Sequence, residues 1–478
     1  MKALRFTLLL ACALAAGACK NALEETPRDF VSTQNFFRTE SEAKSAVYSL
    51  YNTVVNGDAY NVSLYFLNDL PTPAMDGLVN VATVSVDNFT YDATLPYLDY
   101  YYGAYTGILR ANLILERVPS ITMDPAAREA LLGEARFMRA LHYFNLVRLF
   151  GDVPLMTKSA VELDAAVNNP RTNREQIYQL ILDDLRQAEN ALPLTYPPAE
   201  VGRAPRAAAK LLLAKVHLTR REFTQARDKS REVMNLGVHR LVADYRDVFD
   251  PARKNNAEHI FSAQYKQFRV GAWFESILSP PGTTGCGFAN NLAGVSQKFF
   301  DAYPNTYRKE VSMMTSYVTT QGRTLTFDRP YVKKFIAWGP ETVCFSGENN
   351  FPILRYAEAL LVFAEAENEV NGPTPAAYDA LNQLRKRART RPNGVEDVTA
   401  LPDLSGLTKD TFREAAWRER EMELCFEGHG WFDLVRTGRL LSANRAEGKT
   451  NVAEKHLLFP LPQRALDLNQ GLVQNPGY

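Results

Sequence analysis

The sequence predicts a mainly α fold in which tetratricopeptide-like (TPR-like) helix pairs form a right-handed array, with one irregular, loop-rich insertion. Apolar residues recur at helical spacing on both sides of residues 238–350, whereas glycines, prolines and aromatic residues replace that periodicity inside this segment. Small residues recur where the two helices of a pair would touch, at Ala207, Ala214, Ala226, Ala357, Ala364 and Ala377. The repeat length is not constant, so a generic helical array is the alternative.

The first helix is expected to begin at a capping box formed by Thr39 and Glu42, in which each side chain bonds the other residue's backbone N–H. Residues 57–93 are rich in Asn, Asp, Thr and Tyr, and we expect a loop there. A long helix should follow over residues 95–117, because Tyr and aliphatic residues line one side of it.

Four further helices are expected before the insertion. Helical spacing predicts one over 126–150, which a glycine followed by a proline would end. A second capping box, Thr172 with Glu175, should start another that ends at a proline, and Pro205 should open the next. Residues 222–236 supply its partner helix.

Inside the insertion, residues 259–265 resemble a short strand or extended loop. The helical pattern returns over 351–371, 374–389 and 410–427, and Gly428 should end the last of these helices. The tail from residue 458 contains three prolines, so we expect it to be irregular.

The N-terminus has the three parts of a secretory signal peptide: a short basic start, an apolar run and small residues before a cysteine. The apolar run is shorter than the roughly 20 residues that span a membrane. We therefore predict a signal peptide over 1–18, a lipid on Cys19 and an extended tether over 19–38. Ala16 stands where such lipidation sites usually carry Leu, and an ordinary signal peptide cut near Ala18 is the alternative.

The charge balance and the cysteines limit the classes of partner. Lys and Arg together number 54, as do Asp and Glu, so no electrostatic argument favours nucleic acid, and we expect no nucleic-acid partner. The cysteines lack the CxxC pairs of a zinc site and the histidines are scattered, so we expect no metal and no cofactor. Cys286 and Cys344 either form a disulfide or, with Cys425, remain free thiols.

Several long motifs resemble one protein family, the SusD/RagB-type nutrient-binding outer-membrane lipoproteins. They are GEARFMRA (133–140), LFGDVPL (149–155), Arg203 with 207–218, LRYAE (354–358), EGHGWFDLVRTG (427–438) and QNPGY (474–478). The resemblance extends from Cys19 to the last residue and implies a SusD-like fold, with helical regions over 39–237 and 351–478 around the segment 238–350. His429 stands where the family usually has Arg, and Thr306 stands where an Asp commonly precedes Arg308. We expect neither departure to touch the core motifs.

The resemblance implies a binding protein and no enzyme. Family members lie on the outer membrane through a lipid anchor, facing the exterior, and pass oligosaccharides, or sometimes peptides, to a SusC-like TonB-dependent transporter. A TPR-like envelope scaffold without a small-molecule ligand is the alternative from another class. A glycoside hydrolase would need two carboxylates facing each other across a cleft, which a sequence does not show.

The charged residues of the motifs are expected to be structural, because polar groups inside a helical array need partners. Glu134, Arg139 and Arg436 are examples. A catalytic pair such as Glu365 and Glu367 is disfavoured, since residues two apart on a helix point to different faces.

Glycan binding requires flat aromatic faces for sugar rings and polar side chains for hydroxyls, and loops on a rigid scaffold often carry such groups. Two loop-like segments, 57–92 and 265–350, are rich in both, and the family draws ligand contacts from these two regions. The predicted ligand-binding residues are Tyr65, Asp76, Asn80, Trp273, Phe274, Asn290 and Trp338. Trp273 is the foremost candidate, because it follows two small residues in a polar stretch. For any one aromatic residue, local packing is the alternative.

Overall fold

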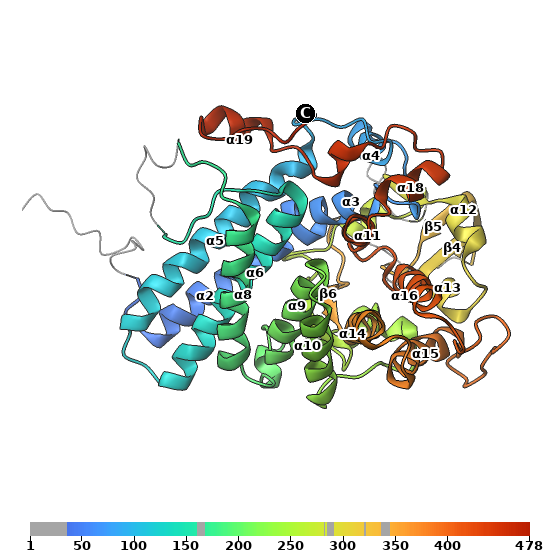
Figure 1. Cartoon of the computed structure of the whole chain (residues 1–478), viewed down its shortest axis with the longest axis horizontal. Helices are drawn as coiled ribbons and strands as arrows, with labels where there is room; N and C mark the ends of the chain where they lie inside the picture. The colour runs from blue at the N-terminus through green and yellow to red at the C-terminus, as the bar shows by residue number, and fades with distance from the viewer. Residues whose placement is uncertain (1–35, 160–167, 282, 284–290, 320–321, 336–344) are drawn as a thin grey trace, which may run out of the picture.

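The computed structural model describes residues 36–159, 168–281, 283, 291–319, 322–335 and 345–478. These residues confirm a mainly α fold, and Figure 1 shows the long helices following one another from left to right, with each packed on its neighbour. The long helices are α2 (Glu40–Val55), α5 (Tyr100–Arg117), α6 (Pro125–Phe150), α8 (Arg174–Ala191), α9 (Arg206–Thr219), α10 (Phe223–Asn235), α14 (Tyr356–Asn371), α15 (Pro375–Arg389) and α16 (Lys409–Leu424).

Local signals in the sequence set several of the helix ends. Both hydrogen bonds of the predicted capping box at Thr39 are present at the start of α2. Gly151, with a φ of 72°, ends α6 in a conformation that favours glycine. The second predicted capping box is wrong: Asn173, one residue after Thr172, caps α8 by accepting the backbone N–H of Glu175.

Residues 57–93, predicted to be a loop, contain regular structure. A π-helical turn (Gly57–Asn61) is followed by α3 (Ser63–Asp69), β1 (Met75–Gly77) and α4 (Val81–Asp87). Every residue of α3 is buried, so this helix has no polar face and no amphipathic period by which a sequence could reveal it.

The C-terminal helical region, 351–478, also begins differently from the prediction. Residues 351–355 form a strand, β6 (Phe351–Arg355), and the helix α14 starts only at Tyr356. All five residues of β6 are buried, and no turn residue separates them from α14. In the sequence, the apolar residues of the strand therefore run directly into those of the helix and look like its first turn. The helix α16 ends at Leu424, four residues before Gly428.

Short elements fill the insertion and the C-terminal region. The helices are α11 (Phe274–Ile277), α12 (Gln297–Ala302), α13 (Tyr307–Ser312), α17 (Gly430–Arg436), α18 (Leu440–Ala446) and α19 (Gln463–Leu468). The strands are β2 (His259–Ala263), β3 (Ala293–Val295), β4 (Met313–Val318) and β5 (Thr324–Val332). The strand predicted near residue 259 is thus confirmed, whereas the tail expected to be irregular carries α19.

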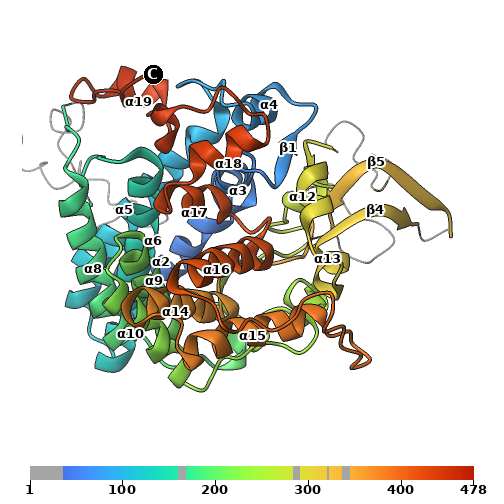
Figure 2. The same ribbon diagram turned by 45° about the vertical axis from the view of Figure 1, so that its right-hand side comes forward.

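Two of the three antiparallel two-stranded sheets in the described residues hold the insertion in place. The strands β2 and β6 pair at its two ends, and β1 from the N-terminal half pairs with β3 inside it. The strands β4 and β5 form a hairpin that projects to the right in Figure 2. The insertion is therefore bound by backbone hydrogen bonds to the helical array at its base and to the N-terminal half.

A continuous hydrophobic core runs from α2 through the insertion to the C-terminal helices, and a second cluster lies between α14, α15 and α16. None of the helices in the described ranges is both long and apolar enough to cross a membrane.

Candidate functional site

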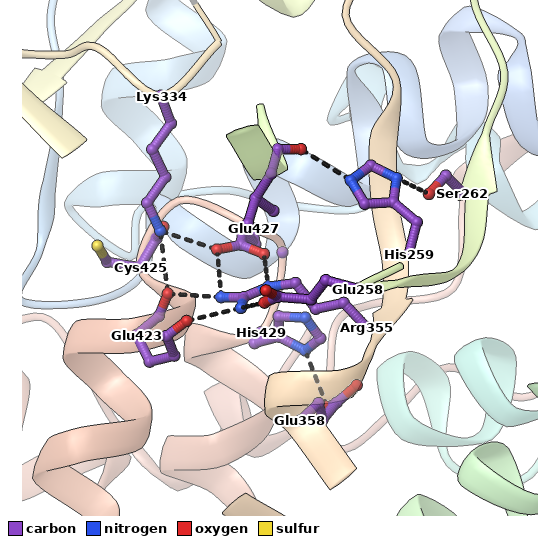
Figure 3. Close-up of polar contacts among 12 residues, drawn as sticks. Glu258, His259, Ser262, Lys334, Arg355, Glu358, Glu423, Cys425, Glu427 and His429 are labelled. Atoms are coloured by element: carbon purple, nitrogen blue, oxygen red, sulfur yellow. Dashed lines mark hydrogen bonds and ion pairs between the residues drawn. The ribbon is translucent and has the colours of Figure 1, made fainter. Parts of the chain in front are cut away.

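A cluster of paired charged side chains lies in the interior where β2 and β6 meet α16 (Figure 3). It comprises Glu258, Arg308, Lys334, Arg355, Arg387, Glu419, Glu423 and Glu427, and we call it the buried ionic network. At its centre, Arg355 donates from Nη1 to Glu258 at 2.9 Å and to Glu423 at 2.6 Å, and from Nε to Glu427 at 2.7 Å.

The buried ionic network joins helices and strands to one another, and a substrate cannot reach its side chains. Arg355 is 2% exposed, and the side chain of Glu423 has no exposed surface. Burial alone raises the pKa of the Glu423 carboxyl, but the guanidinium groups of Arg387, Arg355 and Arg308 hold that pKa well below its usual range. The carboxylate is thus permanently ionised and paired, which suits a structural role.

The charged residues of the helical motifs are also paired, as the sequence predicts. Arg139 donates to both oxygens of Asp184 at 2.8 Å, and Arg203 donates to Glu134. Arg436 donates from Nη1 and Nη2 to Glu365 at 2.5 and 2.9 Å. These bidentate pairs satisfy buried polar groups between helices.

Glu365 and Glu367 have separate partners, so they do not act as a pair. Glu365 also accepts the indole N–H of Trp417 at 2.9 Å, whereas Glu367 accepts from Asn371 and Thr374 at 3.1 Å each.

Trp273 and Phe345 form an exposed pair of aromatic side chains, which we call the aromatic platform. Their ring centroids lie 5.4 Å apart, and the rings are inclined at 67°. Trp273 is 41% exposed and Phe345 is 36% exposed. The flat face of a single exposed aromatic ring matches the C–H face of a sugar ring, and aromatic side chains are common in ligand sites.

The N-terminal half positions Trp273. The almost fully buried Asn61 accepts the backbone N–H of Trp273 at 2.5 Å and donates to the carbonyl of Gly271 at 3.1 Å. A Cβ on Gly57 would lie 3.4 Å from the Trp273 ring, so the indole rests against this glycine. Segments more than 200 residues apart in the sequence therefore orient the indole together.

The second half of the insertion holds the platform from the other side. Ala272 and Gly347 exchange backbone hydrogen bonds at 2.9 and 3.0 Å, and the backbone N–H of Phe345 donates to Ser276 Oγ at 3.0 Å. A Cβ on Gly271 would lie only 2.2 Å from the Cα of Ser346. Only glycine permits this close approach of the two backbones.

Phe268, which is not among the predicted ligand-binding residues, lies in the turn that precedes Gly271. It is 77% exposed, and its backbone N–H donates to Ser346 Oγ at 2.7 Å. Both Phe268 and Phe345 adopt positive φ angles, 59° and 55°, which are unfavourable for bulky residues. Such strain persists where surrounding contacts impose it, and it is common at ligand sites. The signal in the sequence was an aromatic residue among polar residues before Gly271.

Two predicted ligand-binding residues, Tyr65 and Phe274, lie in the core and have no exposed surface. The hydroxyl of Tyr65 donates to the sulfur of Met75 at 3.4 Å, and the Phe274 ring packs on Phe335 and Phe351. A side chain without exposed surface cannot stack on a ligand, so their assignment as ligand contacts is corrected to support of the core beneath the surface.

Asp76 and Asn80 belong to a segment of the sequence far from Trp273 and Phe345. Asp76 is in β1, 3.5 Å from Arg329, and the exposed Asn80 caps α4 by accepting the backbone N–H of Ala82 at 2.7 Å. No hydrogen bond or ion pair within the described ranges joins either of them to Trp273. Both remain predicted ligand-binding residues, at a part of the surface other than the aromatic platform.

Five predicted residues, Cys19, Cys286, Asn290, Trp338 and Cys344, lie outside the described residues. Across the described part of the chain, no group of three or more His, Cys, Asp or Glu residues is arranged to hold a metal ion.

Comparisons with known proteins identify the family from both halves of the chain. Residues 296–478 match the model of the SusD family, and residues 23–218 match a model described as starch-binding and associating with the outer membrane. A SusD-like protein of Formosa agariphila, P25, is 28% identical over 96% of this chain and 97% of its own length. The chain belongs to the SusD family.

Solved SusD-type structures share the fold. A SusD homologue from Bacteroides thetaiotaomicron superposes with a TM-score of 0.82 at 25% identity, covering 93% of this chain and 98% of the other. A laminarin-binding SusD-like protein superposes with a TM-score of 0.78 at 24% identity, covering 92% and 100%.

The two residues that depart from the usual SusD motifs, Thr306 and His429, are buried. Arg308, which follows Thr306 by two residues, donates to Glu419 and Glu423 in the buried ionic network. His429 lies 3.6 Å from Glu358, and burial lowers the pKa of its imidazole well below the usual value, so the ring is neutral.

Proposed function

We propose that this SusD-family chain is a surface-exposed lipoprotein that binds oligosaccharides, or peptides, and delivers them to a SusC-like TonB-dependent transporter in the outer membrane. The observation that carries the proposal is the aromatic platform of Trp273 and Phe345. Large exposed aromatic side chains whose backbone is held by buried polar groups are typical of binding surfaces.

The names of related proteins support a glycan as the ligand. One matching family model is described as starch-binding, and a structural neighbour is described as laminarin-binding. Both starch and laminarin are neutral glucans, whose sugar rings suit stacking on a tryptophan. We therefore propose a neutral oligosaccharide as the ligand of the aromatic platform.

The chain is proposed to bind its ligand without chemical change. Hydrolysis of a glycosidic bond needs a proton donor and a second carboxylate facing the same sugar. The carboxylates of the buried ionic network lack access to solvent, so they cannot take part in this reaction. Burial also raises the pKa of the Cys425 thiol to about 11, so the thiol stays protonated and does not act as a nucleophile.

A binding screen with product analysis tests this function. The full chain, purified in detergent, is titrated with a panel of neutral oligosaccharides, with peptides as a second arm, and the mixtures are then analysed for shortened products. We expect saturable binding of at least one oligosaccharide and an unchanged ligand. Shortened products would contradict the absence of enzyme activity, and a lack of binding to every oligosaccharide would contradict the proposed ligand class.

A further inference from the structure

A groove with a volume of about 710 Å³ opens between four helices and the C-terminal segment. Its walls come from α6, α8, α9 and α17 and from residues 454–458 and 475–476. In Figure 2, α8, α9 and α17 all lie in the left half of the molecule. The groove shares no lining residue with the aromatic platform, and its volume lies within the range of small-ligand sites.

Basic side chains outnumber acidic ones along this groove. Five lining residues are basic, Arg148, Arg174, Arg220, Arg436 and Lys455, and two are acidic, Glu175 and Glu454. Arg220 and Arg436 are each already bonded to two carboxylates. The charge available to a ligand therefore comes from the other three basic residues.

Arg148 presents a partly buried positive charge without a counter-ion. Its guanidinium is stacked between the rings of Phe144, at 3.8 Å, and Phe432, at 3.5 Å. It donates to the carbonyl of Phe144 and to the amide oxygen of Asn145, but no carboxylate in the described ranges lies within 4 Å of it. Burial lowers the pKa of Arg148 to about 10, which reflects the cost of this unpaired charge.

The carboxylate that acts on Arg148 at longer range is already occupied. Glu358 accepts from Lys215 at 3.0 Å and from Arg420 at 2.8 Å. The protein itself therefore leaves Arg148 uncompensated, and an anion in the groove would supply the missing charge.

Arg174 and Lys455 provide two further positive charges at the groove. Among the described residues, the only carboxylate paired with the Arg174 guanidinium is that of Glu175, at 3.9 Å, which also accepts from Arg220 at 2.7 Å. Lys455 lies 4.6 Å from the centre of the Tyr478 ring and has no carboxylate within 4 Å in the described part of the chain.

We propose that this groove is a second binding site, which takes an oxyanion group of an acidic oligosaccharide, a carboxylate or a sulfate. A guanidinium fixed by stacking presents its remaining N–H groups in the plane that carboxylate and sulfate oxygens prefer. The exposed Arg174 and the partly exposed Lys455 attract the anion, and Phe432 and Tyr178 supply apolar contact for the sugar.

The test uses trigalacturonate, which carries carboxylates only, and a sulfated galactose disaccharide without a uronic acid as separate probes, with a neutral trisaccharide as the reference. Titrations of the full chain are made with the Trp273→Ala variant. Because this variant lacks the main side chain of the aromatic platform, the measured binding reports on the groove alone. We expect one or both acidic probes to bind more tightly than the neutral one, and more weakly as NaCl is raised. Binding of only one acidic probe would identify the group as a carboxylate or as a sulfate.

Arg174 and Lys455, which are exposed and partly exposed, provide the variants, because removing Arg148 from between two rings endangers folding. The double variant Arg174→Gln, Lys455→Gln should weaken binding of the acidic probe by about tenfold, since each side chain offers a charge-assisted contact. Arg186→Gln, on the same helix as Arg174 and also exposed, is the matched control and should have no effect. Absence of binding by both acidic probes, or equal affinity of the double variant and its parent, would overturn the proposal.

Discussion

Glu423 shows how single residues hold distant parts of this chain together. Its carboxylate accepts hydrogen bonds from Arg308, Arg355 and Arg387, which belong to α13, β6 and α15. An ion pair in the interior is costly to form, but once formed it is costly to break, because the remaining partners are charged and without water. The network is therefore expected to specify how the insertion sits on the helical array.

Replacing this carboxylate should destabilise the fold severely. We expect Glu423→Gln to lower the free energy of unfolding by about 3–5 kcal/mol, since it leaves three buried guanidinium groups short of one negative charge. Urea denaturation at pH 7 measures the change. The exposed Glu414 lies on the same helix, and Glu414→Gln should change the free energy by no more than about 0.5 kcal/mol. Equal stability of the two variants would contradict the structural role.

The contribution of Glu423 should also depend on pH. Its folded pKa lies below the value of 4.5 expected in the unfolded chain, so the unfolded state binds more protons as the pH falls. The difference in stability between the parent and Glu423→Gln should be full above about pH 4.5 and should shrink at lower pH. Denaturation curves from pH 3 to pH 7 test this, and a difference that grows on acidification would be inconsistent with it.

At the scale of elements, α5 packs on α6 through a glycine. A Cβ on Gly107 would lie 2.4 Å from Nε2 of His142, a buried imidazole bonded to Thr53 Oγ1 at 2.7 Å. On the same helix, a Cβ on Gly103 would meet only the Cβ of Asp58, at an ordinary 3.7 Å. The two glycines have the same helical backbone but different surroundings.

Alanine should therefore have opposite effects at these two positions. Gly103→Ala should raise the free energy of unfolding by up to about 1 kcal/mol, because alanine favours a helix. Gly107→Ala should lower it by about 1–3 kcal/mol, because overpacking exceeds that gain. Thermal denaturation of both variants measures the difference. Stabilisation by Gly107→Ala would show that α5 and α6 do not approach so closely.

Amphipathic helices were predictable from the sequence, and fully buried elements were not. Apolar residues at helical spacing, from Ile177 to Leu192, predict α8, because the other face of that helix is polar. The helix α3 and the strand β6 are buried on all sides, so neither has a period that identifies it. The same limit applies to the site: the sequence shows that Tyr65, Phe274 and Trp273 are aromatic, but only packing shows that Trp273 alone is exposed.

For the whole molecule, the predicted lipid at Cys19 and the tether over 19–38 would place the helical array close to a membrane. The prediction of a lipid anchor rests on the signal-peptide pattern of the N-terminus, which ends in small residues before a cysteine. A stable lipid anchor gains its free energy from buried acyl chains, which serine cannot carry.

Cys19→Ser should accordingly transfer the protein from the membrane fraction to the soluble fraction. The comparison is made in cells that lack the transporter gene, so that a protein partner does not retain the variant. Fractionation followed by immunoblotting measures the distribution, with Cys425→Ser, a buried position, as the control for loss of a thiol. Retention of Cys19→Ser in the membrane would rule out the lipid anchor.

The central claim is that the aromatic platform binds an oligosaccharide, and calorimetric titration of Trp273→Ala tests it most directly. The ligand is the oligosaccharide that binds the parent chain most tightly. Tyr48→Ala is the matched control, because Tyr48 is 43% exposed and Trp273 is 41% exposed. We expect the dissociation constant to rise about tenfold for Trp273→Ala, from loss of stacking and of buried apolar area, and to stay unchanged for Tyr48→Ala. An unchanged dissociation constant for Trp273→Ala would contradict the claim.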